Sequence, residues 1–384
     1  MKKREPVKQE SSAPLTVEEV SKPTLGDIPE NVPSMKVALL VPLSGESASI
    51  GNTMFDAASM ALYDSYVAVP SDKIKTQLVL IPKDTGVTAT ETAQMAQQAV
   101  EQGASFVIGP LFSQSVTSVK PVLADKKITM LSFSNNKSVA APNVYTFGVL
   151  PEQQVERIAE HAYLSKFQRV ALLAPNDAYG EKVRDTLSDV YLRKGGQVFP
   201  SELFASSQAN IDAAVTRISS AYNNSPEDRR FQAIFIADSG AQMPIIIKAL
   251  KKNIDLKRIK IFGTGVWDDE ALLKIPELAG AQFPSPPPEL YEKFETRFKN
   301  AYGYKPVRLA GLAYDAVTIA AHMAIDGNGI NEAEMTTEEG FNTPAGGLVR
   351  LLKNGTSERK LAIMEVTPDG FKVIDRVPRS FSDE

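Results

Sequence analysis

From residue 36 onward, short apolar runs alternate with amphipathic stretches. Lys36–Val41 (KVALLV) is a representative run, stopped by Pro42, and runs of this length and composition predict buried strands. Alternation of such strands with helices is typical of βαβ units around a mainly parallel sheet, so we expect an α/β fold. The predicted strands cover 36–41, 77–81, 105–108 and 128–131, and then 169–173, 197–204, 233–236 and 259–262.

Apolar residues at helical spacing occupy the intervals between these strands. The clearest helix start is the capping box at Thr88–Glu91 (TATE). The proline-rich segment Phe283–Pro288 breaks the pattern and predicts a hinge or an edge crossing. The predicted helices lie near 54–62, 88–100, 115–125, 152–165, 183–191, 210–221, 241–251, 290–301 and 309–324, and a hairpin at 360–366 and 371–374 follows, turning at Thr367–Gly370.

Length and composition argue against several classes of function. At 384 residues with 43% hydrophobic and 23% charged residues, the chain suits two lobes, each with its own core. A formal net charge of −4 argues against a nucleic-acid or anionic-membrane surface, which needs a basic field. The absence of cysteine excludes disulfides and thiolate chemistry, and only His161 and His322 are available to a histidine metal centre.

Residues 1–35 are polar and proline-bearing, and we interpret them as a flexible tether. The segment lacks the apolar core of a signal peptide, and no later run is long enough to span a bilayer. Two alternatives follow: a cytoplasmic protein, or a chain that begins after a removed export signal. A polar leader before a folded domain is also typical of a mature lipoprotein, which predicts a membrane contact only through an N-terminal lipid anchor.

No catalytic signature stands out, and no cofactor or metal is predicted. The sequence contains no Gly-x-Ser-x-Gly elbow, no phosphate loop and no His-Glu-x-x-His. The glycine pairs Gly263/Gly265 and Gly327/Gly329 lack the third glycine of a dinucleotide turn. These negative findings favour a binding protein over an enzyme.

Polar residues follow the carboxyl ends of the predicted strands, where ligands bind in open α/β sheets. The candidates are Ser113 and Gln114 after the third strand, Ser134, Asn135 and Asn136 after the fourth, Tyr179 after the fifth, Asp238 after the seventh, and Trp267 and Asp268 after the eighth.

Each candidate has a structural alternative. Ser115, Asn176 and Asp238 stand where helix caps are needed, and capping alone accounts for them. Tyr179 is expected either to pack or to form a cleft wall. Trp267, the only tryptophan, either lines a cleft or fixes its own loop, and we favour the loop. His161 and His322 are expected to be structural.

Four motifs taken together resemble the type I periplasmic binding proteins, a family that includes the branched-chain amino-acid receptors of ABC importers. They are Val41–Gly45 (VPLSG), Ile108–Pro110 (IGP), Asp177–Gly180 (DAYG) and Ala310–Asp315 (AGLAYD). The resemblance implies two Rossmann-like lobes joined by three crossings, with the ligand trapped between them by hinge closure. On this basis we expect lobe 1 to comprise 36–148 plus 279–327, and lobe 2 to comprise 149–278 plus 328–384.

The resemblance also assigns roles to the candidates. Ser113, Ser134, Asn135 and Asn136 match the positions that hold the carboxylate of an amino-acid ligand, and Tyr179 matches the aromatic residue that closes from the other lobe. The acidic residue that clamps the ammonium group is missing from Gly263–Trp267, and neither Asp238 nor Asp268 matches it by position. Because an unpaired buried ammonium is unfavourable, this argues against an ordinary amino-acid ligand.

A second branch of the same fold is similar in other segments. The segment Gly263–Asp268 (GTGVWD), the proline-rich stretch and the ending Val373–Phe381 (VIDRVPRSF) look like the penicillin-binding protein activator lipoproteins of alphaproteobacteria. Two hypotheses result. One is a periplasmic receptor that presents a small polar ligand to an ABC permease or a sensor, and the other is a lipoprotein that uses the fold to contact a peptidoglycan synthase.

Overall fold

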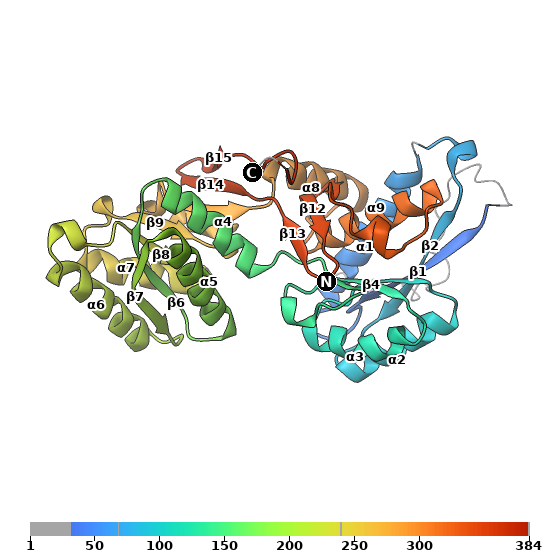
Figure 1. The fold of residues 1–384 in the computed structure, drawn as a ribbon, viewed down its shortest axis with the longest axis horizontal. Coiled ribbons are helices and arrows are strands. Elements are labelled where there is room, and N and C mark those ends of the chain that lie inside the picture. Colours follow the sequence, from blue (N-terminus) through green and yellow to red (C-terminus); the bar gives the residue numbers. More distant parts are fainter. Residues whose placement is uncertain (1–31, 68, 239, 383–384) are drawn as a thin grey trace, which may run out of the picture.

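The computed structural model describes residues 32–67, 69–238 and 240–382, which form two lobes side by side (Figure 1). Most of the predicted tether, residues 1–31, lies outside the described residues, and its last two residues, Ser34 and Met35, begin strand β1. Within the described residues, no helix combines the length and the apolarity that crossing a membrane requires.

The first lobe is built on a fully parallel five-stranded sheet. Successive residues of its interior strand β1 point to opposite faces, and both faces are buried, which is why the strand is one continuous apolar run. The strand order is β2 (Gln77–Asp84), β1 (Ser34–Val41), β3 (Phe106–Ile108), β4 (Thr129–Ser132) and β5 (Val144–Thr146).

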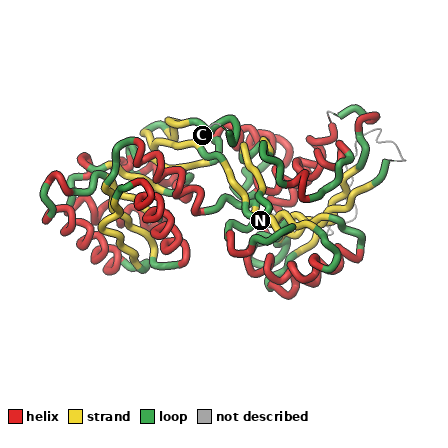
Figure 2. Tube along the Cα trace, in the orientation of Figure 1, coloured by secondary structure: helices red, strands yellow, loops and turns green. Residues whose placement is uncertain are grey.

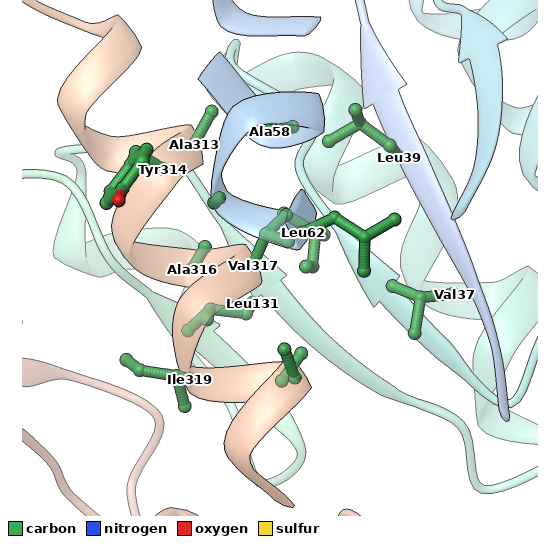
Figure 3. Close-up of a cluster of buried hydrophobic side chains, with 14 of the residues drawn as sticks. Val37, Leu39, Ala58, Leu62, Leu131, Ala313, Tyr314, Ala316, Val317 and Ile319 are labelled. Atoms are coloured by element: carbon green, nitrogen blue, oxygen red, sulfur yellow. The ribbon is translucent and has the colours of Figure 1, made fainter. Parts of the chain in front are cut away.

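Helices cover both faces of this sheet. On one face, α1 (Ala48–Val67), α8 (Pro288–Tyr302) and α9 (Ala310–Asp326) pack on Val37 and Leu39, and Figure 3 shows these strand residues beside Leu62 of α1 and Val317 of α9. On the other face, α2 (Ala89–Glu101) and α3 (Ser113–Ala124) pack on Ala38 and Leu40. Sequence-distant α1 and α9 are thus joined in one core.

The second lobe has a seven-stranded sheet in which five strands pair in parallel and the C-terminal two-stranded hairpin joins them by antiparallel pairing. Helices α4 (Pro151–Leu164) and α5 (Ala178–Lys194) cover one face, and α6 (Gln208–Asn224) and α7 (Met243–Asn253) cover the other. The strand order is β15 (Gly370–Asp375), β14 (Ala362–Thr367), β10 (Gln282–Ser285), β9 (Lys260–Gly263), β8 (Ala233–Ile236), β6 (Arg169–Pro175) and β7 (Gln197–Phe204). Figure 2 shows the helices flanking the strands in each lobe.

A small antiparallel sheet completes the first lobe. Its central strand buries Val349 and Leu351 in the same core as α1 and α9. The strands are β11 (Phe341–Thr343), β12 (Gly347–Leu351) and β13 (Ser357–Arg359), preceded by the short helix α10 (Glu332–Met335). In the described part of the chain, eight short 3₁₀ turns lie in the connections, at 71–73, 137–139, 227–229, 240–242, 256–258, 265–267, 270–274 and 276–278.

The chain crosses between the lobes three times. Crossing 1 (147–150) leads from β5 into α4, crossing 2 (286–287) leads from β10 into α8, and crossing 3 (360–361) leads from β13 into β14. The predicted α/β fold of two mainly parallel lobes is confirmed.

Two predicted lobe boundaries are wrong. The chain enters the first lobe after β10 rather than at 279, since β10 pairs with β9 and β14 of the second sheet. It leaves after β13 rather than at 328, since β12 packs in the first core. Pro284 within a four-residue strand made β10 look like a break, and local periodicity does not reveal which lobe a short strand joins.

Candidate functional site

A cavity of about 560 Å³ lies where the two lobes meet. Crossings 1 and 2 contribute to its wall, together with loops and helix starts from both lobes and the end of β13 beside crossing 3. The lining residues of the first lobe are Ser47, Ile50, Leu111, Phe112, Phe133, Asn135, Tyr291, Arg308, Leu309, Gly311, Leu312, Asp315, Ala345, Gly346 and Arg359, those of the second are Gln154, Gly265, Val266 and Asp268, and those at crossings 1 and 2 are Gly148, Val149 and Pro286.

Most of this wall is apolar. Phe112, which precedes α3, and Val266, which follows β9, reach the cavity from opposite lobes and are 49% and 38% exposed. Large apolar side chains on facing lobes lose water contact when lobes close over a ligand, and this burial is favourable. An apolar wall with a few placed polar groups is typical of a small-molecule site.

One ion pair links the lobes across the cavity. The Arg308 guanidinium of the first lobe donates to the Asp268 carboxylate of the second. Arg308 also stacks over the Tyr291 ring, 3.9 Å from its centroid, and the Ser285 hydroxyl donates to the same carboxylate oxygen of Asp268 at 3.0 Å. Both charged groups are therefore already engaged.

Asp315, in the middle of the apolar helix α9, is fully buried. Its Oδ1 accepts the Ala345 N–H at 2.8 Å, and its Oδ2 accepts the Gly346 N–H and the Thr343 hydroxyl, each at 2.8 Å. Burial raises the pKa of Asp315 to about 6, and the nearby Arg359 charge and these hydrogen bonds oppose the rise. The carboxylate fixes the β11–β12 turn against α9.

Arg359, the last residue of β13, is 6% exposed, and its side chain has fewer hydrogen-bond partners than the Asp315 carboxylate. Its Nη2 donates to the Phe147 carbonyl at 2.9 Å, and the guanidinium lies 4.5 Å from the centroid of the Phe147 ring. Its Nε and Nη1 are buried without a hydrogen-bond partner in the described part of the chain. Burial lowers the pKa of Arg359 to about 10, and Asp315 opposes this shift.

Gly346 separates the two buried charges. A Cβ at this position would lie 2.7 Å from Arg359 Nη1 and 2.7 Å from Asp315 Oδ2, both far inside contact distance. Only glycine therefore lets the turn pass between the guanidinium and the carboxylate.

Side chains of helix α4, in the second lobe, form hydrogen bonds with the backbone at and beside crossing 3. The Gln153 amide donates to the Ser357 carbonyl and accepts the Arg359 N–H at 3.2 Å. One turn later, Arg157 Nε donates to the Leu361 carbonyl at 2.9 Å. Because crossing 1 leads directly into α4, these bonds couple crossings 1 and 3.

Of the residues predicted from sequence, Asn135 and Asp268 line the cavity. Ser113 and Ser134 instead bond each other through their hydroxyls at 3.1 Å, and Ser134 also accepts the Asn136 N–H at 3.2 Å. The Asn136 side chain caps the 137–139 turn by accepting the Ser138 N–H. These residues shape the loop that presents Asn135, and Gln114 is exposed outside the cavity lining.

The predicted second-lobe residues form a separate group. The Tyr179 hydroxyl lies 2.6 Å from Thr264 Oγ1, and burial raises the pKa of Tyr179 to about 12. Trp267 is fully buried, packs on Gly263 and donates from Nε1 to the Asp238 carbonyl at 2.8 Å. Trp267 thus fixes its loop, the favoured alternative, while its neighbours Val266 and Asp268 line the cavity.

Sequence reasoning missed Arg308, Asp315 and Arg359. A signal existed for Asp315, because a lone carboxylate inside the apolar segment 310–325 needs buried partners. Nothing local marks Arg359, whose contact with Phe147 joins residues 212 positions apart.

His161 has structural contacts, and no metal site is found among the described residues. His161 Nε2 lies 3.2 Å from Gln282 Oε1, and its Nδ1 lies 3.6 Å from Asp375. Burial lowers the pKa of His161, so the ring ties α4 to β10 and β15 in its neutral form. Among the described residues, no group of three or more His, Cys, Asp or Glu side chains is placed to hold a metal ion.

The family model described as "Periplasmic binding protein" matches residues 34–371. This match spans both lobes and confirms the resemblance noted in the sequence. A solved structure described as a putative branched-chain amino acid ABC transporter from Rhodospirillum rubrum superposes with a TM-score of 0.76 over 89% of this chain and 100% of that one, at 17% identity.

A second solved structure has the same fold. It is a solute binding protein of an ABC transporter from R. palustris in complex with benzoate, with a TM-score of 0.61 over 91% of this chain and 98% of that one, at 15% identity. At these identities both likenesses concern the fold.

One curated relative is a penicillin-binding protein activator, the second group that the sequence resembles. The penicillin-binding protein activator LpoA of Photobacterium profundum is 29% identical over 189 residues, which is 47% of this chain and 28% of that protein. The chain spans less than two thirds of the length of the first curated relatives that it matches.

Proposed function

Because the chain belongs to the periplasmic binding protein family, we propose that it captures a small ligand between its two lobes as an extracytoplasmic solute receptor. The observation that carries this proposal is the cavity itself, whose wall takes residues from both lobes, from crossings 1 and 2, and from the end of β13 beside crossing 3. A ligand there contacts both lobes at once, and its binding energy therefore favours the arrangement in which they are close.

The hinge geometry supports the same function. Gln153 and Arg157 tie crossing 3 to the helix that crossing 1 enters, so these two connections move as a unit. The Arg308–Asp268 pair already spans the cavity from lobe to lobe. A hinge of a few residues with facing walls is the usual architecture of ligand-driven domain closure.

The partner and location follow from this function. We propose that the loaded protein delivers its ligand to an ABC permease or a sensor in the periplasm, and that a lipid anchor holds the protein at the membrane. Its role is binding rather than catalysis. The similarity to a putative ABC transporter protein supports the permease as partner.

A second candidate function is activation of a peptidoglycan synthase. The similarity to LpoA, 29% over 189 residues, favours it. In that case the two-lobed fold acts as an interaction module, and a surface outside the cavity contacts the synthase.

A thermal-shift screen separates the two candidates. Amino acids, organic acids and cell-wall fragments are each added to the full chain, and the melting temperature is recorded. Ligand capture predicts a rise for at least one compound, since a ligand at 100 times its Kd stabilises the folded state by about 2.7 kcal/mol. Unchanged melting with every compound, together with binding to a synthase domain, would support the second candidate instead.

A further inference from the structure

The charged groups of the cavity are unequally satisfied. Its lining holds two carboxylates and two guanidiniums: Asp268, Asp315, Arg308 and Arg359. Asp268 accepts from Arg308 and Ser285, and Asp315 accepts from three donors. Both carboxylates therefore already have partners, with which an additional cation would compete.

Arg359 is the exception. A guanidinium has five N–H donors, and the one side-chain hydrogen bond of Arg359 goes to the Phe147 carbonyl. Its Nε and Nη1 are buried without a partner among the described residues. A buried cation with unmatched donors is unfavourable unless an acceptor or a negative charge lies beside it. Asp315 supplies a nearby negative charge but no hydrogen bond to Arg359, because its oxygens accept from the β11–β12 turn.

We propose that Arg359 is the carboxylate-binding residue of the cavity, and that the ligand is an apolar monocarboxylate without an ammonium group. This inference rests on the proposed capture of a ligand between the lobes. A carboxylate beside the guanidinium supplies the missing hydrogen-bond acceptor, and charge-assisted bonds of this kind are among the strongest in proteins.

The surroundings of Arg359 fit the other half of such a ligand. The apolar body would face Phe112, Leu309 and Val266, which line the same cavity from both lobes. An amino acid fits less well, because its ammonium group would enter a cavity whose carboxylates are already engaged. The cavity is therefore expected to bind an amino-acid zwitterion more weakly than a monocarboxylate.

The position of Arg359 also explains how binding would reach the hinge. Its backbone N–H is held by Gln153 of α4 and its side chain by Phe147 of crossing 1. A carboxylate at this residue would sit at the junction of crossings 1 and 3, and an anion there stabilises both connections at once.

The test is calorimetric titration of the full chain with two matched pairs of compounds. One pair is 4-methylpentanoate and leucine, which differ by the ammonium group, and the other is benzoate and benzamide, which differ by the negative charge. We expect each carboxylate to bind at least about tenfold more tightly than its counterpart, equivalent to about 1.4 kcal/mol. Equal or tighter binding of leucine or benzamide would overturn the inference.

Two variants test whether Arg359 is the residue that binds the carboxylate. Arg359→Gln is expected to weaken carboxylate binding about 10- to 100-fold, the usual range for a lost hydrogen bond to a charged group. Arg217→Gln is the matched control, since Arg217 pairs with Glu202 on the surface of the second lobe, outside the cavity lining. Undiminished binding by a folded Arg359→Gln protein contradicts the inference. If that variant does not fold, the wild-type titrations decide alone.

Failure of this inference is distinguishable from failure of the proposed function. Tight binding of a ligand that carries no carboxylate would overturn the role of Arg359 and leave capture between the lobes standing. No binding by any compound of the titrations or the screen would count against both.

Discussion

The fold strongly changes the ionisation of Asp315. It is buried in α9 at the wall of the cavity, and burial raises its pKa from an ordinary 3.8 to about 6. The folded protein thus keeps a proton on this carboxyl at a pH where the unfolded chain has released it. By linkage, its contribution to stability is greatest below about pH 4 and is lost as the pH rises through 6.

We expect this contribution to be visible in the pH dependence of unfolding. The free energy of unfolding of the wild type, minus that of Asp315→Asn, should fall between pH 4 and pH 6, because the asparagine does not titrate. Chemical denaturation at several pH values measures the difference. A difference that is flat over this interval would show that the carboxyl titrates at its ordinary pKa, and a difference that increases would show that folding lowers its pKa.

At the same scale, the sequence identified part of the candidate site. Asn135 and Asp268 line the cavity as expected for residues that follow strand ends. Ser113, Ser134 and Asn136 lie in the right loops, but their side chains bond to one another or to neighbouring backbone. Position in the chain predicts which loop reaches a cleft, whereas the direction of each side chain depends on local competition for hydrogen bonds.

Among the secondary-structure elements, α4 has the clearest mechanical role. Its Gln153 amide forms two hydrogen bonds with the backbone of β13, next to crossing 3. Because both bonds are partly buried, their loss leaves a carbonyl and an N–H without partners, which costs about 1–3 kcal/mol each at most.

We expect Gln153→Ala to lower the free energy of unfolding by about 1–3 kcal/mol and to speed hydrogen exchange of the Arg359 amide. Gln97→Ala is the control, because the Gln97 amide bonds only to Glu101 on the exposed face of α2 among the described contacts. Urea denaturation and exchange mass spectrometry provide the two measurements. Equal effects of the two substitutions would mean that α4 does not hold crossing 3.

Element prediction succeeded where periodicity is strong. Strands 197–204 and 233–236 have the predicted bounds, and the helices of both lobes lie within a few residues of expectation. The missed strands β5, β10, β11, β12 and β13 are three to five residues long. Such strands are defined by the partner they pair with, as β10 is by β9 and β14, and this information is absent from their own composition.

For the whole molecule, the central claim is that two lobes close over a ligand at the cavity where they meet. The chain contains no cysteine, so single cysteines can be introduced on each lobe without competing thiols. Suitable positions are Gln98 in α2 of the first lobe and Leu192 in α5 of the second, both exposed.

The most direct test is the distance between spin labels at Gln98→Cys and Leu192→Cys. It is measured by pulsed electron–electron double resonance, with and without a saturating ligand from the titrations. The account predicts a shorter and narrower distance distribution in the bound state, since one ligand contacts both lobes. An unchanged distribution at a concentration where calorimetry demonstrates full binding would contradict capture by lobe closure.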